Sequence, residues 1–176
     1  MKRARAHARR VASDVPARCA VLTVSDTRRG KEDLSGELAE RLIRRAGHAV
    51  VARAWVRDEI RAIRRAARAL IARAAVDALI VGGGTGVAAR DVTPEAILPL
   101  CERRLAGFGE SFRALSAAEV GTAAWLSRAD AGIANGRLVV ILPGSRAAMK
   151  LGLERVLLPE LFHIMRLLGR RSTPKE

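Results

Sequence analysis

The sequence VGGGTGVAARDVTPEA occupies residues 81–96, and the rest of the chain can be understood outward from it. It follows the apolar run 78–81, which is typical of a short buried strand. It ends at Thr93-Pro94, where a cap residue and a proline suit the first turn of a helix. Four glycines among residues 82–86 leave backbone N–H groups without side-chain cover, so these groups can surround an anion such as phosphate. The stretch predicts a strand, an anion-binding glycine loop and a helix.

Asp91 lies in the same loop and places a carboxylate beside the predicted phosphate site. Because a carboxylate repels bare phosphate, Asp91 indicates either a bridging Mg²⁺ ion or a purely structural cap. Residues 84–89 formally match the dinucleotide pattern G-x-G-x-x-A, but the helix signal comes too late for that motif, and no Gly-Lys-Ser/Thr completes a P-loop. A glycine-rich turn that only lets strand and helix pack closely is the simpler alternative.

Length and composition bound the class of protein. A chain of 176 residues is enough for one domain with a proper core. The formal net charge of +14 would suit a nucleic-acid partner, yet three Phe, two Trp and no Tyr offer few rings on which bases could stack. The arginines are also dispersed along amphipathic segments. We therefore expect a solvated basic surface that favours small anionic substrates, and no nucleic-acid partner.

The chain ends and the cysteines carry little chemistry. Residues 1–17 are rich in Arg and Ala and are predicted to form a flexible basic arm, ahead of one domain at 18–170 and a short tail at 171–176. Cys19 and Cys101 belong to no C-x-x-C pair, so we expect reduced thiols and no zinc site. No apolar stretch approaches the length of a membrane span, and no signal-peptide core follows the basic start. These features favour a soluble, cytoplasmic protein.

Strand and helix patterns alternate along the chain. A continuous apolar, β-branched run at 19–24, an alternating pattern at 48–56 and a further strand pattern at 77–81 predict three strands separated by amphipathic helices. Such alternation implies right-handed crossovers and a parallel sheet covered by helices on both faces. Asn135-Gly136 predicts a type I′ hairpin that adds an antiparallel strand beside a last central strand. The predicted fold is an α/β three-layer sandwich with a mostly parallel, doubly wound sheet and one antiparallel hairpin strand.

Three predicted loops leave the carboxyl ends of strands, the edge at which open α/β sheets bind ligands. They contain Ser25-Asp26, Asp58-Glu59 and residues 82–91. Asp58 also stands where it could cap the following helix. The sequence Pro143-Gly144-Ser145 opens a last long helix, where the serine marks either a second anion site or a plain cap.

The remaining segment between the glycine loop and the hairpin is less regular. A short helix after Pro94 is disturbed by Pro99, the sequence GFGESFR follows at 107–113, and another helix is expected near 117–123.

Taken together, these motifs resemble the MoaB/MogA family of molybdenum-cofactor biosynthesis proteins. The resemblance runs from Cys19 to the last helix. It is carried above all by GGTG at 83–86, RDVTPEA at 90–96 and GFGE at 107–110, supported by VSD at 24–26, Asp33 with Ser35-Gly36, Asp58-Glu59 and PGS at 143–145. One position departs from the family, where threonine is frequent and this chain has Gly82.

The resemblance implies a molybdopterin-binding fold and transfer of AMP from ATP to the terminal phosphate of molybdopterin, with Mg²⁺ assisting and pyrophosphate leaving. Asp58 and Asp91 match the two functional aspartates and would hold the metal. The substrate-binding residues implied by the match are Ser25, Asp26, Gly83, Gly84, Thr85, Gly86, Glu110, Pro143, Gly144 and Ser145. It further implies a homotrimer or homohexamer and a downstream molybdate-insertion protein as partner.

The chemistry of the residues agrees with such a reaction. Phosphoryl-group transfer needs positioning and neutralisation of charge, which amide-rich loops and metal-holding carboxylates supply, and it needs no protein nucleophile. The competing hypothesis is a non-catalytic molybdopterin-binding or scaffold protein of the same fold, in which Asp58 and Asp91 only cap helices and loops.

Overall fold

The computed structural model describes residues 14–27 and 32–170. Six strands form one sheet in the order β2-β1-β3-β6-β5-β4, in which β2, β1, β3 and β6 are parallel and β5 and β4 are antiparallel. The strands are β1 (Arg18–Val24), β2 (Ala49–Val56), β3 (Ala78–Gly82), β4 (Arg103–Arg104), β5 (Asp130–Ala134) and β6 (Arg137–Leu142). The α-helices are α1 (Leu34–Arg45), α2 (Ile60–Ile71), α3 (Thr93–Ile97), α4 (Ala106–Val120), α5 (Arg146–Leu151) and α6 (Leu158–Leu167).

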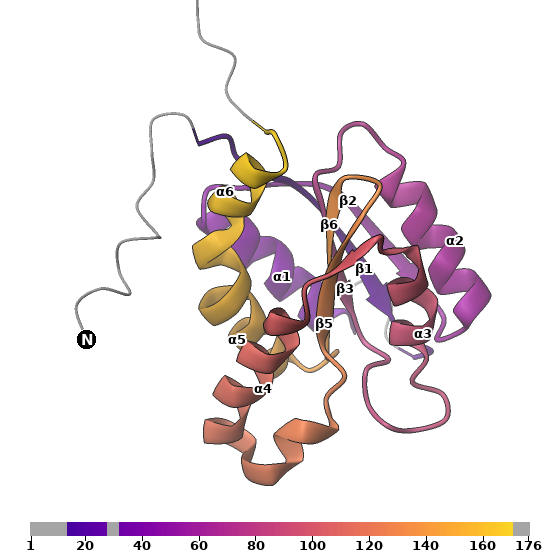
Figure 1. The fold of residues 1–176 in the computed structure, drawn as a ribbon. Helices are drawn as coiled ribbons and strands as arrows, with labels where there is room; N and C mark the ends of the chain where they lie inside the picture. The colour runs from indigo at the N-terminus through magenta and orange to yellow at the C-terminus, as the bar shows by residue number, and fades with distance from the viewer. Residues whose placement is uncertain (1–13, 28–31, 171–176) are drawn as a thin grey trace, which may run out of the picture.

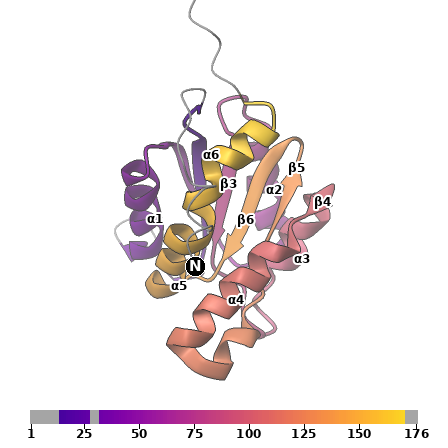
Figure 2. The same cartoon turned by 60° about the vertical axis from the view of Figure 1, so that its left-hand side comes forward.

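Helices cover both faces of the sheet, as Figures 1 and 2 show: α2 and α3 lie on one side, and α1, α4, α5 and α6 on the other. The side chains of β1 explain the two layers, because Cys19 and Val21 point into one core while Ala20, Leu22 and Val24 point into the other. A strand buried on both faces has to be apolar throughout, which is the pattern of its sequence. The predicted three-layer, mostly parallel fold is confirmed.

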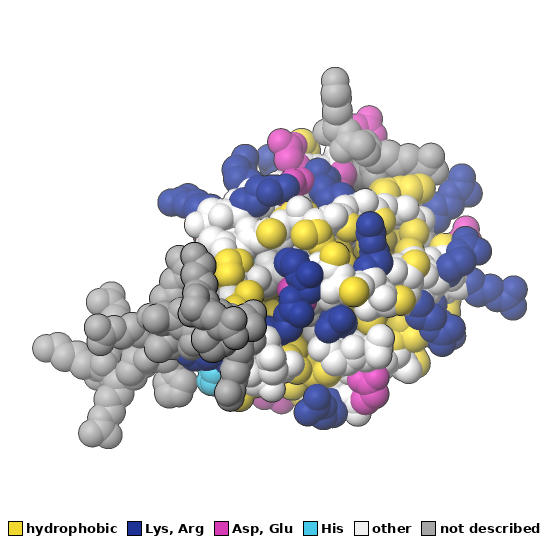
Figure 3. Space-filling model, turned by 90° about the horizontal axis from the view of Figure 1, so that it is seen from above, with side chains coloured by type: hydrophobic (Ala, Val, Ile, Leu, Met, Phe, Trp, Pro, Cys, Tyr) yellow, Lys and Arg dark blue, Asp and Glu magenta, His cyan; other side chains and the backbone are white. Residues whose placement is uncertain are grey.

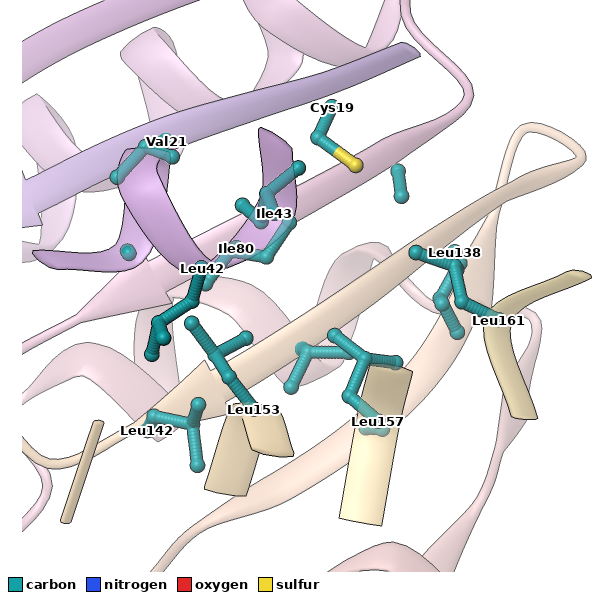
Figure 4. Close-up of a cluster of buried hydrophobic side chains, with 14 of the residues drawn as sticks. Cys19, Val21, Leu42, Ile43, Ile80, Leu138, Leu142, Leu153, Leu157 and Leu161 are labelled. Atoms are coloured by element: carbon teal, nitrogen blue, oxygen red, sulfur yellow. The ribbon is translucent and has the colours of Figure 1, made fainter. Parts of the chain in front are cut away.

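The larger core lies between the sheet and the helices α1, α5 and α6. Figure 4 shows Leu42 and Ile43 of α1 and the leucines of the last helices meeting strand residues such as Ile80 and Leu138. These side chains are almost fully buried. Burial of this apolar surface is the main force that holds the helices on the sheet.

The hairpin is confirmed in detail. Asn135 and Gly136 both have positive φ, at 50° and 67°, as a type I′ turn requires. The turn joins β5 to β6, and β6 lies beside β3 in the centre of the sheet. The hairpin therefore extends the parallel sheet with antiparallel strands.

Two helical predictions differ from the structure. The sequence GFGE lies within the first turns of α4, which runs without a break to Val120 and continues as the 3₁₀ helix η3 (Gly121–Leu126), so the separate helix expected near 117–123 is wrong. The last helix is interrupted by a π-helical segment, Gly152–Leu157, just before Pro159. Proline lacks the N–H that a continuous α-helix needs at this position, which accounts for the interruption.

The folded domain begins at an earlier residue than the sequence predicts. Ala17 is fully buried, its N–H donates to Nδ1 of His48 over 3.1 Å, and its carbonyl accepts from the N–H of Ala49. Asp14 forms an ion pair with Arg166 on α6. Residues 14–17, assigned by sequence to the flexible arm, thus belong to the folded domain, while 1–13 and 171–176 lie outside the described residues. In the part of the chain that is described, no helix has the length and apolar character to cross a bilayer.

Basic residues are spread over the face of the molecule that is seen in Figure 3. In the view of Figure 3, Lys and Arg side chains are scattered across the face among hydrophobic and uncharged ones rather than gathered into one patch. Such a dispersed arrangement is what the sequence suggested.

Candidate functional site

A cleft of about 380 Å³ opens at the carboxyl ends of the parallel strands. Its wall is built by the loops that leave β1, β2, β3 and β6, because parallel strands all end at the same edge of the sheet. The lining residues are Thr23, Val24, Ser25, Asp26, Thr27, Asp33, Ser35, Asp58, Gly82, Gly83, Gly84, Arg90, Asp91, Gly144 and Ser145. The volume is within the range of small-molecule sites.

Glycine is required in the loop for two physical reasons. Gly83 and Gly84 have φ angles of +117° and +61°, and a Cβ on Gly83 would lie 2.1 Å from the carbonyl oxygen of Val24. The N–H of Gly83 donates to the carbonyl of Leu142, so this amide is not available to a ligand, contrary to the prediction. Among the described residues, the N–H groups of Gly84, Thr85 and Gly86 have no such acceptor, and they form the part of the predicted anion site that the structure leaves open.

Gly82 belongs to β3 rather than to the loop. It pairs with Leu142 and Thr23 in the sheet, and a Cβ there would lie 2.6 Å from Cε of Met149. Glycine in place of the threonine that is frequent in the family therefore leaves space for the side chain of Met149, and it adds no flexibility to the loop because residue 82 belongs to the strand.

Asp58 reaches the cleft and does not cap α2. The N-cap of α2 is Glu59, whose side chain makes no capping bond, so the predicted capping role of Asp58 is wrong. Both carboxylate oxygens of Asp58 lie 2.7 Å from the position of a Cβ on Gly84, and Oδ1 accepts the N–H of Val92 over 3.4 Å. The absence of a side chain at Gly84 thus allows Asp58 to lie directly against the glycine loop.

The pKa of Asp58 is raised above its ordinary value, mainly by burial and further by the negative charge of Asp91, against the opposing hydrogen bond from Val92. Asp91 also lines the cleft, so the two carboxylates face one small space. A pair of carboxylates that repel each other is an arrangement that a cation would stabilise.

Asp91 has a second role inside its own loop. Its Oδ2 accepts the N–H of Ala88 over 3.1 Å, and its N–H donates to the carbonyl of Ala88. A Cβ on Gly86 would lie 2.6 Å from the same Oδ2. The carboxylate therefore both closes the loop and borders the cleft, so the catalytic and structural interpretations of Asp91 are not exclusive.

Asp26 joins three loops. It forms an ion pair with Arg90 of the glycine loop, and its Oδ1 accepts the backbone N–H of Asp58 over 3.1 Å. The N–H of Ser25 donates to the carbonyl of Val56 at the end of β2. Arg90 compensates the charge of Asp26, and Arg53 compensates that of Asp33. Among the described residues, Asp58 and Asp91 are the acidic groups of the cleft without an ion-pair partner.

The remaining predicted residues divide into those that reach the cleft and those that do not. Ser145 accepts the N–H of Ala148 and caps α5, in agreement with the simpler of its two interpretations, and Gly144 lies next to Gly83. Thr85 and Gly86 lie in the loop and Pro143 directly precedes Gly144, but none of the three lines the cleft. Glu110 is exposed on α4 and lies outside it.

Two further residues organise the site. Asp33 caps α1 and accepts hydrogen bonds from Oγ1 of Thr23 and Nη2 of Arg53, so it holds the wall of the cleft beside β1. An aspartate directly before an amphipathic helix signals such a cap. Arg128 binds the glycine loop from behind, and no local pattern indicates it because its partners lie 33 or more residues away.

The described residues hold no cluster of three or more His, Cys, Asp or Glu side chains that could bind a metal alone. Asp58 and Asp91 offer two carboxylates, the number that Mg²⁺ commonly takes from a protein when substrate phosphates and water supply its other ligands. The residues therefore fit a magnesium ion that arrives with a phosphorylated substrate.

Comparison with known proteins identifies the family. A family model described as "Probable molybdopterin binding domain" matches residues 20–163. The molybdenum cofactor biosynthesis protein B of Halalkalibacterium halodurans is 45% identical over 150 residues, which are 85% of this chain and 88% of the relative.

Two solved structures extend the similarity to the fold. A crystal structure of a molybdenum cofactor biosynthesis protein B has a TM-score of 0.87 at 40% identity and covers 90% of this chain and 99% of its own. The molybdopterin biosynthesis enzyme MoaB of Thermus thermophilus has a TM-score of 0.72 at 32% identity over 89% of this chain and 99% of its own. The chain therefore belongs to the MoaB/MogA family of molybdenum cofactor biosynthesis proteins.

Proposed function

We propose that the protein is a molybdopterin adenylyltransferase, which transfers AMP from ATP to the terminal phosphate of molybdopterin. An oxygen of the molybdopterin phosphate attacks the α-phosphorus of ATP, the bond between the α-phosphorus and the bridging oxygen breaks, and pyrophosphate leaves with its electron pair. The observation that carries the proposal is the convergence of Asp58, Asp91 and the glycine loop on one cleft.

Each part of the cleft has a task in this reaction. The open N–H group of Gly84, which borders the cleft, donates to a phosphate oxygen, as amides in glycine loops do, and the N–H groups of Thr85 and Gly86 follow it in the loop. Asp58 and Asp91 would hold a Mg²⁺ ion, which would neutralise the charge that develops on the phosphates. The ion pair between Asp26 and Arg90 keeps the loops after β1 and β3 at a fixed separation. Since the attacking group belongs to the substrate, the protein supplies orientation and charge rather than a nucleophile.

A non-catalytic molybdopterin-binding or scaffold protein is the second candidate. The observation in its favour is that Asp91 closes its own loop through Ala88, which gives the carboxylate a structural purpose without catalysis. Under this alternative the cleft would bind molybdopterin without turnover of ATP.

One assay separates the two. Purified protein is incubated with molybdopterin, ATP and Mg²⁺, and adenylylated molybdopterin and pyrophosphate are measured together, with binding of molybdopterin recorded separately. We expect both products in equal amounts. Binding without either product would refute the transferase and support the scaffold.

We also propose that the protein is a homo-oligomer, as a trimer or a dimer of trimers. The support is an apolar surface at the end of α4 and along η3, where the exposed fractions of Val120, Trp125 and Leu126 are 54%, 72% and 38%. Light scattering of the wild type and of Trp125→Glu tests this. A monomer mass for the wild type at all concentrations would contradict the proposal.

A further inference from the structure

The glycine loop, which joins β3 to α3, borders two hollows. In front of it lies the cleft, and behind it lies a second hollow of about 440 Å³, lined by Val87, Ala88, Ala89, Asp91, Val92, Glu95 and Arg128. Asp91 borders both. Residues 87–90 of the loop are exposed and are not held by packed side chains, so their position depends on a few polar contacts.

Arg128, which lies between η3 and β5, makes most of the contacts that reach the loop from behind. Its backbone N–H donates to the carbonyl of Thr85 over 3.0 Å, and its Nε donates to the carbonyl of Gly86 over 2.9 Å. Its Nη2 donates to the carbonyl of Asp91, and its Nη1 forms an ion pair with Glu95 at the start of α3. One residue therefore binds both ends of the segment 85–91 and the helix that follows it.

These contacts determine where Asp91 stands. The backbone of Asp91 is held by Arg128, and its carboxylate is held by the N–H of Ala88. Arg128 does not line the cleft, and three of its nitrogens already have partners in the loop and on α3. Its influence on a substrate must therefore pass through the loop.

We propose that Arg128 is a positioning residue for the transfer reaction: its guanidinium fixes the glycine loop so that the carboxylate of Asp91 faces Asp58 across the cleft. This inference rests on the proposed adenylyl transfer. The role requires arginine, because a planar guanidinium donates to three groups in fixed directions and an ammonium group cannot match them. Lysine at this position preserves the charge and loses the geometry.

The test compares Arg128→Ala and Arg128→Lys with Arg64→Ala. Arg64 is a matched control because its guanidinium also binds two backbone carbonyls, those of Glu95 and Ala96 on α3, and neither of these hydrogen bonds goes to residues 85–91. Four quantities are measured for each protein: kcat, the KM for molybdopterin, the melting temperature, and the hydrogen-exchange rates of the hydrogen-bonded amides of Ala88, Asp91 and Val92.

We expect kcat of both Arg128 variants to fall about 10- to 100-fold, the loss expected when a reacting group is displaced by about 1 Å. The KM for molybdopterin should stay near the wild-type value, and exchange of the amides of Ala88, Asp91 and Val92 should become faster. Arg64→Ala should lose thermal stability comparably while retaining kcat and slow exchange in the loop.

Three results would overturn the proposal: wild-type kcat in Arg128→Ala, full activity in Arg128→Lys, or an equal loss of kcat in Arg64→Ala. If the wild type itself shows no transfer, the proposed function fails, and loop exchange still decides the role of Arg128. Faster exchange in its variants alone would then support the positioning role, and unchanged exchange would refute it.

Discussion

Replacement of Asp58 by asparagine separates the catalytic from the structural role of this carboxylate. The change keeps the shape of the side chain and removes its negative charge. Its structural cost is small, because the hydrogen bond that its side chain accepts from Val92 is 3.4 Å long and can also be accepted by the asparagine oxygen. We expect a change in the free energy of unfolding of less than about 1 kcal/mol.

The direction of the stability change follows from the pKa of Asp58. Burial and the charge of Asp91 raise this pKa above its ordinary value of 3.8, so the folded protein keeps the proton to a higher pH than the unfolded chain. Stability is therefore lost as the pH rises from 3.8 through the folded-state pKa, and the ionised carboxylate destabilises the fold at neutral pH. Asp58→Asn should melt at the same temperature as the wild type or higher at about pH 7, with the difference vanishing in acid.

The rate should respond in the opposite sense. Removing one charge that stabilises the transition state lowers kcat by about 10² to 10³, or about 3 to 4 kcal/mol. Glu59→Gln is the matched control, because it removes a negative charge from the next residue, whose side chain makes no capping bond. Pyrophosphate release and thermal melting are measured for the three proteins. Normal turnover in Asp58→Asn would show that its charge does not act in catalysis, and a marked fall in its melting temperature at neutral pH would show that the carboxylate stabilises the fold.

Further predictions concern the loop, a buried ion pair and the amino terminus. Gly83→Ala should lower the free energy of unfolding by about 2 to 6 kcal/mol, because a side chain is opposed both by the φ of +117° and by a carbonyl oxygen 2.1 Å from the Cβ position. Gly107→Ala is the control, since a Cβ there meets no atom within 4 Å, and it should be neutral or stabilising in the same urea titration. Burial acts to raise the pKa of Asp77, but the contacts with Arg18 and Arg170 outweigh burial and lower this pKa below 3.8. The ionised Asp77 therefore stabilises the fold above pH 3.8, and this stabilisation is lost as the pH falls through the folded-state pKa. Asp77→Asn should lower the free energy of unfolding by about 2 to 3 kcal/mol at neutral pH. Its melting temperature should also fall less steeply in acid than that of the wild type, and an equally steep fall would contradict the stabilising role of Asp77. Deletion of residues 1–13 should leave the melting temperature unchanged, and deletion of residues 1–17 should lower it, since only the longer deletion removes the buried Ala17. Equal melting temperatures for the two proteins would show that the folded domain begins after residue 17.

Several elements could be predicted because their causes are local. The strands β1 and β3 were recognisable from continuous apolar runs, which a strand buried on both faces requires. The hairpin was recognisable from Asn135-Gly136, because few residues adopt positive φ twice in succession. The position of the cleft followed from the order of strands and helices alone, since parallel strands end at a common edge.

The errors arose where a local pattern had two outcomes. Asp58 before an amphipathic helix looks like a cap, and only the fold shows that Gly84 leaves room for its carboxylate at the loop. The glycines of GFGE suggested an irregular segment, yet Gly109 is needed in α4 because a Cβ there would lie 2.3 Å from the carbonyl of Ala129. In both cases the deciding neighbour is at least 20 residues away in the chain.

The order of the elements and the glycine loop follow from the chain alone, because hydrophobic period and backbone freedom are properties of adjacent residues. Three relations appear only in the folded protein: the carboxylates of Asp58 and Asp91 lie close enough to repel each other, Arg90 compensates Asp26, and Arg128 supports the loop from behind. These relations join residues 33 to 64 positions apart. Their distances depend on how the crossovers pack against the sheet, and no periodic pattern along the chain records that packing.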